Sequence, residues 1–480
     1  MKSISVTLAA LLVLAACGGI GSSGSTMNGS QSVATLGTIT AFGSVYVNGV
    51  RYDVSGASLK KNGLMVTQSG LAVGEVALVH GQQNLQSMLG EASSVDVEDQ
   101  AVGPVGSIDV GASQLTVLGQ TVDVTASTSF GEGITPADLT GLATGDAVEV
   151  SGFAGAGGNI AATRIARAEA SEHLQVLGTV AGLDMSAHTF MINALTVDYS
   201  AAMLSGFTAG QPADGDLVVV RGTMFDATAV KLMADSVQPA DNDPREAAEG
   251  GHVEQEGLIT RFASAMDFDV AGAKVTTTMD TRYEGGTAAD LALNVQVEVR
   301  GMLDASGVLV ADEIEIHHIA AIELESTVTA VDAMNNTLTV LGVTINVDSN
   351  TRYEDQSSAQ VQLFTLANVS VGDNVEIRGY ENPAGSGQVL AGKLERIPPS
   401  TKVEVRGSFM ATMPPQFMIL GITIDASNAD FGDGEGEDEH MLTATDFYTQ
   451  AVGQIVEVEG TASGTTVLAT RVRIDQDEDR

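Results

Sequence analysis

Tryptophan is absent from this sequence of 480 residues, cysteine occurs once, and positive charge is scarce. A single cysteine excludes any disulfide within the chain. The 22 Lys and Arg residues are outnumbered by 61 Asp and Glu, so the formal net charge is −39. A surface this acidic repels phosphate backbones and anionic lipid headgroups, which argues against a nucleic-acid partner. Acidity also keeps a long chain soluble, and we take this as the default explanation of the negative charge.

Hydrophobic runs of membrane-spanning length are missing as well. The run from Ile4 to Leu14 follows a positively charged start and is shorter than the roughly 18 apolar residues that a spanning helix needs. It is typical of a signal peptide, here residues 1–16. The ending Leu14-Ala15-Ala16-Cys17 resembles the lipobox of bacterial lipoproteins. The alternative is a chance cysteine after an ordinary signal peptide.

The lipobox resemblance implies that Cys17 is diacylated on its sulfur and becomes the mature N-terminus. Two or three acyl chains, each contributing about 0.8 kcal/mol per buried methylene, make a durable membrane anchor. Gly18 follows the cysteine, whereas an Asp there holds proteobacterial lipoproteins at the inner membrane, so the resemblance favours the outer membrane. Residues 17–32 are rich in Gly and Ser, which predicts a flexible tether.

The rest of the chain repeats itself. One pattern, apolar-x-apolar-x-Gly, predicts a half-buried strand with aliphatic side chains inward, Glu and Arg outward, and Gly at its end. It occurs six times, at Ala77–Gly81, Val148–Gly152, Val218–Gly222, Val297–Gly301, Val375–Gly379 and Val456–Gly460. Each copy is followed by Ala, two residues and an aliphatic, at Ala92–Val95, Ala162–Ile165, Ala234–Val237, Ala311–Ile314, Ala391–Leu394 and Ala469–Val472.

Other segments recur at fixed places in each copy. Upstream of the glycine-ended strand, two strands flank a turn, as in Leu338–Ile345, and Asn48-Gly49 has the residues that a type I′ hairpin turn requires. Each copy opens with a further strand, such as Leu177–Val180, so the unit has about five strands. Thr281–Glu284 and Thr351–Glu354 both read Thr-Arg-Tyr-Glu, which we interpret as a strand with an inward Tyr and solvent-facing Arg and Glu.

Five short strands can bury a core only by closing on themselves, because a flat sheet would expose one apolar face and two edges. The predicted fold is all-β, about six tandem small five-stranded barrels of the oligonucleotide/oligosaccharide-binding type, arranged as a row of separate barrels with polar residues coating them. The expected order is signal peptide 1–16, tether 17–32, repeats 33–99, 103–170 and 172–239, acidic linker 240–252, and repeats 253–318, 319–398 and 399–475.

The opening Gly-x-Val strand, the hairpin with its Gly turn, the x-Val-x-Gly strand and the Ala-x-x-Ile ending resemble the bacterial domain of unknown function 5666. The resemblance covers the chain from Val33 to Ile474, and copies one and six depart from it most. It implies an exported protein or lipoprotein with tandem domains. It implies no activity, cofactor or site residue.

Side chains able to carry out chemistry do not gather in the sequence. The seven histidines are dispersed, and adjacent His317 and His318 continue a strand-like run, where neighbouring side chains point to opposite faces and cannot easily share one metal. No nucleophile, phosphate-binding or zinc motif is present. Sugar sites usually stack rings on aromatic platforms, of which this chain has few. We predict no catalytic residue, no cofactor and no metal site.

One acidic segment, Asp430–His440, alternates carboxylates with glycines and could wrap Ca²⁺, although its spacing matches no calcium loop and a solvated loop is the alternative. A catalytic site shared by six copies would repeat an acid, base or nucleophile at one aligned position, yet only Val, Gly and Ala recur. We therefore expect a lipid-anchored envelope protein that is not an enzyme. Its expected role is a structural or interaction scaffold with a protein or polysaccharide partner, and the alternative is a module that binds a ligand or divalent cation.

Overall fold

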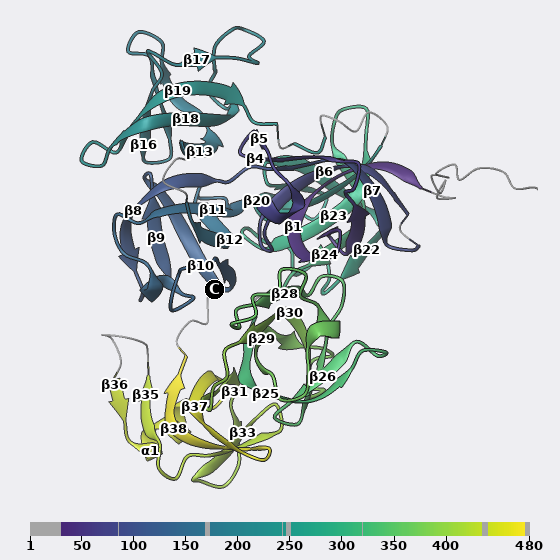
Figure 1. The fold of residues 1–480 in the computed structure, drawn as a ribbon, viewed down its shortest axis with the longest axis vertical. Coiled ribbons are helices and arrows are strands. Elements are labelled where there is room, and N and C mark those ends of the chain that lie inside the picture. Colours follow the sequence, from purple (N-terminus) through teal and green to yellow (C-terminus); the bar gives the residue numbers. More distant parts are fainter. Residues whose placement is uncertain are drawn as a thin grey trace, which may run out of the picture.

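The computed structural model describes residues 30–84, 86–168, 173–241, 243–245, 251–318, 320–433 and 440–475. Strands dominate these residues, so the predicted all-β class is confirmed (Figure 1). The described part has one α-helix, α1 (Ala444–Gln450), and no helix in it is long and apolar enough to cross a membrane. The expected signal peptide, Cys17 and most of the tether lie outside the described residues.

The second copy shows the plan of the unit most simply. Its strands are β8 (Ala101–Asp109), β9 (Gln114–Val117), β10 (Gln120–Phe130), β11 (Ala147–Ala154) and β12 (Ile160–Arg167). The first strand pairs with the second and the fourth, and the fifth pairs with the fourth and, in parallel, with the third. The second also pairs with the third, which closes the barrel. The predicted five-stranded barrel is thereby confirmed.

The other copies follow the same order with small additions. Copy one has β1 (Gln31–Phe42), β2 (Val45–Val47), β3 (Val50–Asp53), β4 (Ser58–Lys61), β5 (Leu64–Met65), β6 (Val76–Asn84) and β7 (Leu89–Val97). Copy three has β13 (Leu174–Thr179), β14 (Ala181–Asp184), β15 (Thr189–Ile192), β16 (Leu195–Asp198), β17 (Met203–Leu204), β18 (Leu217–Asp226) and β19 (Lys231–Pro239). Copy four has β20 (His252–Ser264), β21 (Asp267–Val270), β22 (Ala273–Glu284), β23 (Gln296–Leu303) and β24 (Leu309–Ile316).

Copies five and six carry extra short strands after their third strand. Copy five has β25 (Ile322–Asp332), β26 (Thr337–Val340), β27 (Val343–Asn346), β28 (Arg352–Asp355), β29 (Asn374–Glu381) and β30 (Gln388–Ile397). Copy six has β31 (Val403–Ser408), β32 (Met410–Ala411), β33 (Gln416–Ile419), β34 (Ile422–Asp425), β35 (Asp430–Asp433), β36 (His440–Leu442), β37 (Ile455–Ser463) and β38 (Thr466–Ile474). Copy six also contains α1, which lies between β36 and β37.

The recurring glycine does not end its strand, contrary to expectation. In copy two, β11 continues past Gly152 to Ala154, and its register against β12 shifts between Ser151 and Gly152. A Cβ on Gly152 would lie 2.2 Å from the carbonyl oxygen of Ala161 on the facing strand. The glycine therefore lies opposite a β-bulge in β12, whose extra residue is Thr163, and such bulges increase the twist that a small barrel needs to close. The equivalent glycines of the other five copies meet a facing carbonyl in the same way.

The hairpin turns follow the predicted chemistry. Asn48 and Gly49 have φ angles of 49° and 73°, the positive pair that defines a type I′ turn. The pair Leu341 and Gly342 adopts the same angles in copy five, at 51° and 83°. The turn geometry is thus a property of the repeat, even where a leucine takes the first left-handed position.

The barrels are joined in pairs rather than strung out separately, so the expected row of separate barrels is wrong. The first strands of two copies pair side by side: β1 with β20 in parallel, β8 with β13 and β25 with β31 antiparallel. The described strands therefore form three continuous sheets, each spanning two barrels. One sheet joins copies one and four, which are far apart in sequence but adjacent in space (Figure 1). This pairing covers the first residues of each first strand, which have a neighbouring strand on only one side within their own barrel.

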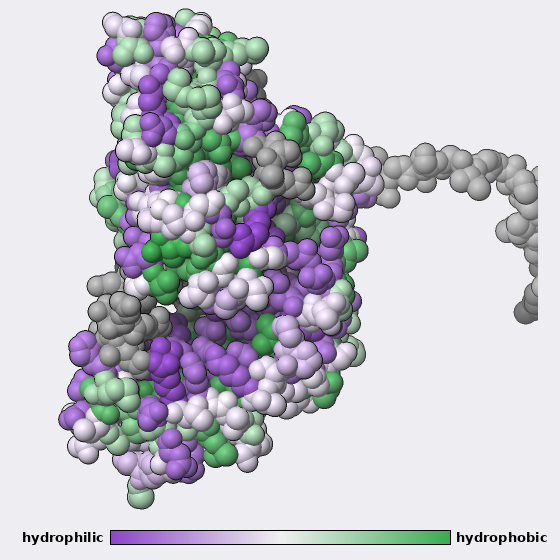
Figure 2. All heavy atoms as spheres, turned by 60° about the vertical axis from the view of Figure 1, so that its left-hand side comes forward, coloured by the Kyte–Doolittle hydropathy of each residue, from purple (hydrophilic) through white to green (hydrophobic). Residues whose placement is uncertain are grey.

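Aliphatic side chains fill the barrels, and a smaller cluster lies between them. Leu36, Val76 and Leu78 of the first barrel contact Phe153 of the second and Leu258 of the fourth. On the face shown in Figure 2, hydrophobic side chains are scattered among hydrophilic ones in small patches. The barrels thus meet through both apolar packing and, as described next, buried charge.

Candidate functional site

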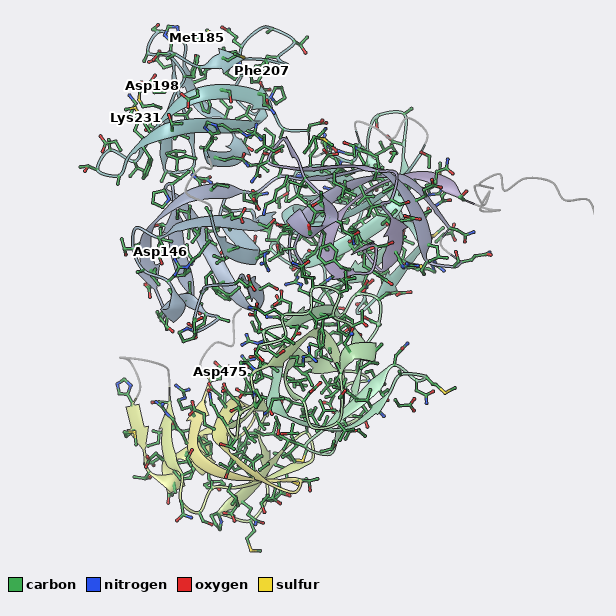
Figure 3. All side chains as sticks on the ribbon, viewed as in Figure 1. Asp146, Met185, Asp198, Phe207, Lys231 and Asp475 are labelled. Carbon is green, nitrogen blue, oxygen red and sulfur yellow. The ribbon has the colours of Figure 1, made fainter. Side chains whose placement is uncertain are left out.

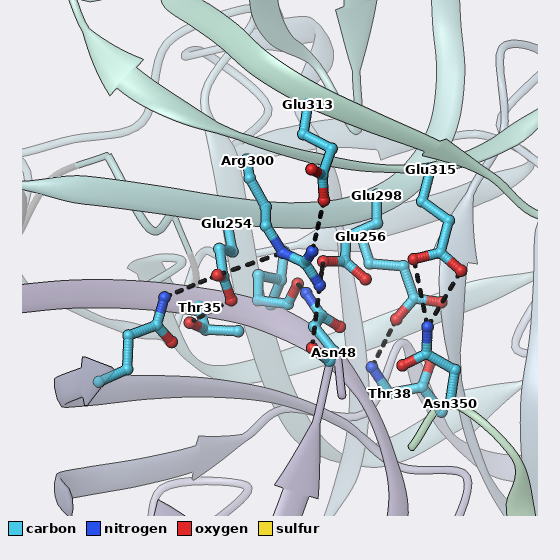
Figure 4. Close-up of polar contacts among 12 residues, drawn as sticks. Thr35, Thr38, Asn48, Glu254, Glu256, Glu298, Arg300, Glu313, Glu315 and Asn350 are labelled. Atoms are coloured by element: carbon cyan, nitrogen blue, oxygen red, sulfur yellow. Dashed lines mark hydrogen bonds and ion pairs between the residues drawn. The ribbon is translucent and has the colours of Figure 1, made fainter. Parts of the chain in front are cut away.

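Charged residues that were expected to face solvent are instead buried between the barrels. Arg300 on β23 forms ion pairs with Glu298 (Nη2 to Oε1, 2.7 Å) and Glu313 (Nη1 to Oε1, 2.7 Å). Its Nε lies 3.3 Å from Oε1 of Glu254 on β20. These side chains surround the Arg300 guanidinium at the contact of the first and fourth barrels (Figure 4). The interpretation of alternating polar residues as a solvated coating is wrong at this junction.

The first barrel supplies hydrogen bonds to the same acidic cluster. Thr35 Oγ1 donates to Glu254 Oε2 at 3.2 Å, and Gln83 Nε2 donates to Glu254 Oε1 at 2.6 Å. The backbone N–H of Thr38 donates to Glu256 Oε2 at 2.7 Å. The parallel pairing of β1 with β20 brings these residues together, so the cluster follows from the way the two barrels are joined.

Acid exceeds base in this cluster. Burial raises the pKa of Glu254 and raises that of Glu298 further, and the charge of Arg300 only partly opposes these shifts. Glu256 and Glu315 accept hydrogen bonds from neutral groups, and within the described residues neither forms an ion pair. Burying a carboxylate without a cation of its own is costly. Three further cations, Arg352, Arg378 and Lys393, line the adjoining cavity together with Glu256 and Glu315 and offset part of this negative charge.

A related network joins the fifth barrel to the second. Arg378 on β29 forms ion pairs with Glu376 (Nε to Oε1, 2.6 Å) and Glu323 (Nη2 to Oε1, 3.1 Å). Its Nη1 also donates to the carbonyl oxygen of Ala126 in the second barrel at 2.8 Å. One guanidinium thus compensates two carboxylates and links two barrels.

Arg352 on β28 is a buried cation that has no ion pair among the described residues. Its Nη1 donates to the carbonyl oxygens of Ser127 (2.5 Å) and Thr163 (3.1 Å) in the second barrel, and its burial lowers its pKa. Arg352 is 9% exposed and Glu354 is 7% exposed, so the solvent-facing prediction for this Thr-Arg-Tyr-Glu motif is wrong. In the fourth barrel the matching Arg282 side chain is 75% exposed, as expected.

The networks meet at a cavity of about 130 Å³ between the first, second, fourth and fifth barrels. Carboxylates, cations and neutral polar groups share its wall, among them Thr38, Glu256, Glu298, Glu315, Asn350 and Arg352. Several buried polar atoms of this wall make no hydrogen bond: Thr38 Oγ1, Asn350 Oδ1, Arg352 Nε, His317 Nε2 and Glu298 Oε1, the last having only its ion pair with Arg300. Buried polar groups are normally hydrogen-bonded, so these unsatisfied atoms indicate that the cavity accommodates polar molecules.

His317 and His318 line this cavity, but they do not continue the preceding strand as the sequence predicted. The strand β24 ends at Ile316, so both residues follow it. The ring of His318 contacts that of Tyr380, with centroids 4.7 Å apart, and its Nε2 contacts the carbonyl oxygen of Gly285. The prediction that they share no metal is not tested by these contacts.

The acidic segment Asp430–His440 is described only at its two ends. Asp430–Asp433 and His440–Leu442 form the paired strands β35 and β36, and residues 434–439 lie outside the described residues, so the calcium prediction is untested.

The one group of potential metal ligands found among the described residues is Glu404, Glu457 and Glu459 in copy six. Lys402 forms an ion pair with Glu404 at 2.6 Å, and Arg473 lies 2.8 Å from Glu457 and 3.5 Å from Glu459. These cations already compensate the carboxylates, so the geometry does not call for a metal.

The fold and the junctions define a tandem-barrel protein whose charged residues hold the barrels together. A family model described as a domain of unknown function (DUF5666) matches residues 102–166, 256–315, 325–395 and 409–473, more than half of the chain. The chain therefore belongs to this family. The matched segments correspond to copies two, four, five and six, so copy six departs less than expected and copy three departs more. No curated protein matches the chain.

The residues that organise the cavity were missed by sequence reasoning. Arg300 and Arg378 occupy the outward positions of the Val-x-Val-x-Gly strand, where Glu and Arg alternate two residues apart. This alternation places Glu and Arg side by side on the outer face of the strand. It was the one sequence signal that this face packs against other charged residues.

Proposed function

We propose that the chain is a non-catalytic scaffold of the cell envelope, anchored in the outer membrane by lipid on Cys17. The signal-peptide pattern and the lipobox-like ending support the anchor. The absence of an aligned acid, base or nucleophile among the repeated residues supports a role other than catalysis. The bulge glycine and the facing alanine, which do recur, serve the backbone geometry of each barrel.

One observation carries the scaffold role. The barrels share sheets in pairs, and buried ion networks at Arg300 and Arg378 connect barrels from different pairs or distant parts of the chain. Such joints hold barrels in a fixed arrangement, whereas independent domains on linkers would move relative to one another. A fixed assembly of six barrels offers an extended surface to a protein or polysaccharide of the envelope.

The anchor is tested by comparing the full chain with a Cys17→Ser variant. We expect the unchanged protein to incorporate labelled fatty acid and to sediment with outer membranes, and the variant to do neither. Equal sedimentation of the two proteins without lipid incorporation would remove the anchor from the proposal.

The scaffold role is tested by cross-linking the lipidated protein in native envelopes and purifying what it holds. A partner recovered in constant proportion supports the proposal. An envelope polysaccharide that is cleaved or modified by the purified full chain would contradict the non-catalytic part.

A further inference from the structure

We propose that this chain consumes two-electron oxidants such as hypochlorous acid at its exposed methionines, which become sulfoxides while the barrels stay folded. The proposal goes beyond the scaffold function and does not depend on it. Two features carry it: the methionines of the described residues lie outside the barrel cores, and the buried cores contain no sulfur atom that an oxidant would alter.

The methionines avoid the interior of the barrels. Met1 and Met27 lie outside the described residues, and none of the other 15 is buried. Met88, Met191 and Met418 are half-buried. The remaining twelve are exposed and comprise Met65, Met185, Met203, Met224, Met233, Met266, Met279, Met302, Met334, Met410, Met413 and Met441. Methionine is among the side chains that are most often buried, so this distribution is the reverse of the usual one.

The exposed methionines do not form one docking face. They occur in the first, third, fourth, fifth and sixth barrels, and the second barrel has no methionine. Their exposure ranges from 36% for Met233 to complete exposure for Met279. A protein-binding surface needs a contiguous apolar patch, whereas a small oxidant needs only an accessible sulfur atom. Scattered exposed thioethers therefore fit a small diffusing reagent better than a protein partner.

The buried cores of the described barrels contain no sulfur. Aliphatic and aromatic side chains fill them, and no methionine is among their buried residues. The chain has no tryptophan, and its single cysteine, Cys17, lies outside the described residues. Oxidation of a core methionine disrupts packing, because it turns an apolar side chain into a polar one. At an exposed position the added polarity meets water, so the sulfoxide costs the fold little.

Hydrogen-bond donors already lie beside two of the sulfur atoms. Gln211 Nε2 donates to Met185 Sδ at 3.1 Å, and Thr196 Oγ1 donates to Met191 Sδ at 3.3 Å. A thioether sulfur is a weak acceptor, whereas a sulfoxide is polar. The same donors are in place to bind the sulfoxide oxygen, so the oxidised side chains keep a polar partner.

The oxidant alone balances the chemical step. The oxygen atom of hypochlorous acid ends on Sδ, and the bond between oxygen and chlorine breaks. Sulfur loses two electrons, and chlorine gains them and leaves as chloride, together with one proton. Sulfoxide reductases return methionine sulfoxide to methionine, so the capacity of such a surface is renewable.

The first test is competition for hypochlorous acid between the full chain and an equimolar reporter peptide that contains one methionine. The oxidant is added at less than one equivalent, and mass spectrometry measures the sulfoxide on the reporter and at each methionine of the chain. We expect the chain to lower oxidation of the reporter about tenfold, because twelve exposed thioethers compete with one. Reporter oxidation that is the same with and without the chain would overturn the proposal.

The second test is thermal unfolding after the twelve exposed methionines have been oxidised. The melting temperature should stay within about 5 °C of that of the untreated chain, which corresponds to a loss of about 1–2 kcal/mol. Methionine sulfoxide reductases should then restore the original mass. A larger fall in melting temperature, or aggregation of the oxidised chain, would contradict the tolerance of the fold.

Two variants locate the reaction. Replacing all twelve exposed methionines by glutamine, from Met65→Gln to Met441→Gln, should preserve the fold and return reporter oxidation close to its level without the chain. The combined variant Leu64→Gln, Leu293→Gln and Leu363→Gln alters exposed apolar side chains without removing sulfur and should protect the reporter as well as the unchanged chain does. Equal protection by the glutamine-for-methionine variant would show that other groups consume the oxidant.

The unchanged chain keeps the test decisive if the glutamine-for-methionine variant fails to fold. Its mass spectra should show sulfoxide at the twelve exposed methionines before Met88, Met191 and Met418. Earlier modification of the half-buried methionines, or of side chains without sulfur, would overturn the proposal.

Discussion

The guanidinium of Arg300 in the fourth barrel donates a hydrogen bond of 3.2 Å to the carbonyl oxygen of Asn48 in the hairpin turn of the first barrel. The two residues are 252 positions apart in the chain. Because Arg300 also neutralises carboxylates at the same place, one side chain both connects two barrels and permits their charges to be buried together. The contact between copies one and four therefore depends on this residue.

Replacing Arg300 should unfold the junction. Arg300→Met leaves Glu254, Glu298 and Glu313 buried without their shared cation, and breaking a buried ion pair in this way costs about 3–5 kcal/mol. Urea denaturation of the full chain measures the loss. Arg261→Met is the matched control, since Arg261 is partly exposed and surface ion pairs contribute about 1 kcal/mol or less. Equal losses in the two variants would show that the network does not stabilise the junction.

The bulge glycines should not tolerate a side chain. In Gly301→Ala the new Cβ would lie 2.0 Å from the carbonyl oxygen of Val310, so β23 and β24 must separate. Overpacking of this kind costs roughly 1–3 kcal/mol. Gly157→Ala is the control, because no atom lies within 4 Å of its Cβ position. Thermal unfolding should show a lower melting temperature only for Gly301→Ala, and a neutral result there would disprove the role of the bulge.

The barrels could be predicted from the sequence, but their arrangement could not. Alternation of Val with polar residues is a local pattern, and it specifies which side chains point into a barrel regardless of what lies outside. The environment of the outward residues depends on contacts such as Val33 with His252, for which no local pattern exists. The shared Thr-Arg-Tyr-Glu motif illustrates this, because Arg282 is exposed and Arg352 is buried. The cavity, which needs four barrels, was out of reach for the same reason.

Stability should fall as pH rises from about 4.5 to 7. Burial raises the pKa of Glu323 from 4.5 to about 7, with Arg378 opposing the shift and Glu376 adding to it. Between these values the folded chain retains a proton that the unfolded chain releases, so raising the pH favours unfolding. The pKa values of Glu254 and Glu298 are raised too, so they act in the same direction.

Groups with lowered pKa values act in a different pH range. A hydrogen bond from Lys231 is the main cause that holds the pKa of Asp198 at about 2 (Figure 3). The stability that this pair contributes is lost only as the pH falls below about 4 toward 2. It therefore does not mask the effect of the buried glutamates between pH 4.5 and 7.

Urea midpoints at pH 5.5 and pH 8 measure the pH effect. The unchanged chain should be more stable at pH 5.5, and Glu323→Gln should be more stable than the unchanged chain at pH 8 and less sensitive to pH. Glu91→Gln, at an exposed position on β7, controls for the loss of one negative charge. Greater stability at pH 8 than at pH 5.5 would mean that the buried glutamates are ionised at no cost.

A substitution in the apolar contact between barrels should weaken their docking without unfolding the individual barrels. Phe153 is 3% exposed, yet it packs outside its own barrel against Leu36 and Leu78 of the first barrel and Leu258 of the fourth. Phe153→Ala removes this contact and should cost roughly 3–5 kcal/mol, most of it from the docking of the second barrel on its neighbours.

Small-angle scattering and far-UV circular dichroism distinguish docking from folding. Phe153→Ala should enlarge the radius of gyration while the strand signal stays unchanged, because the core of the second barrel keeps all its residues. Leu115→Ala truncates a side chain inside that core and should instead weaken the strand signal on mild heating. Identical scattering from Phe153→Ala and the unchanged chain would contradict this prediction. The ion networks alone would then be sufficient to hold the barrels in place, and the apolar cluster around Phe153 would not be needed for their arrangement.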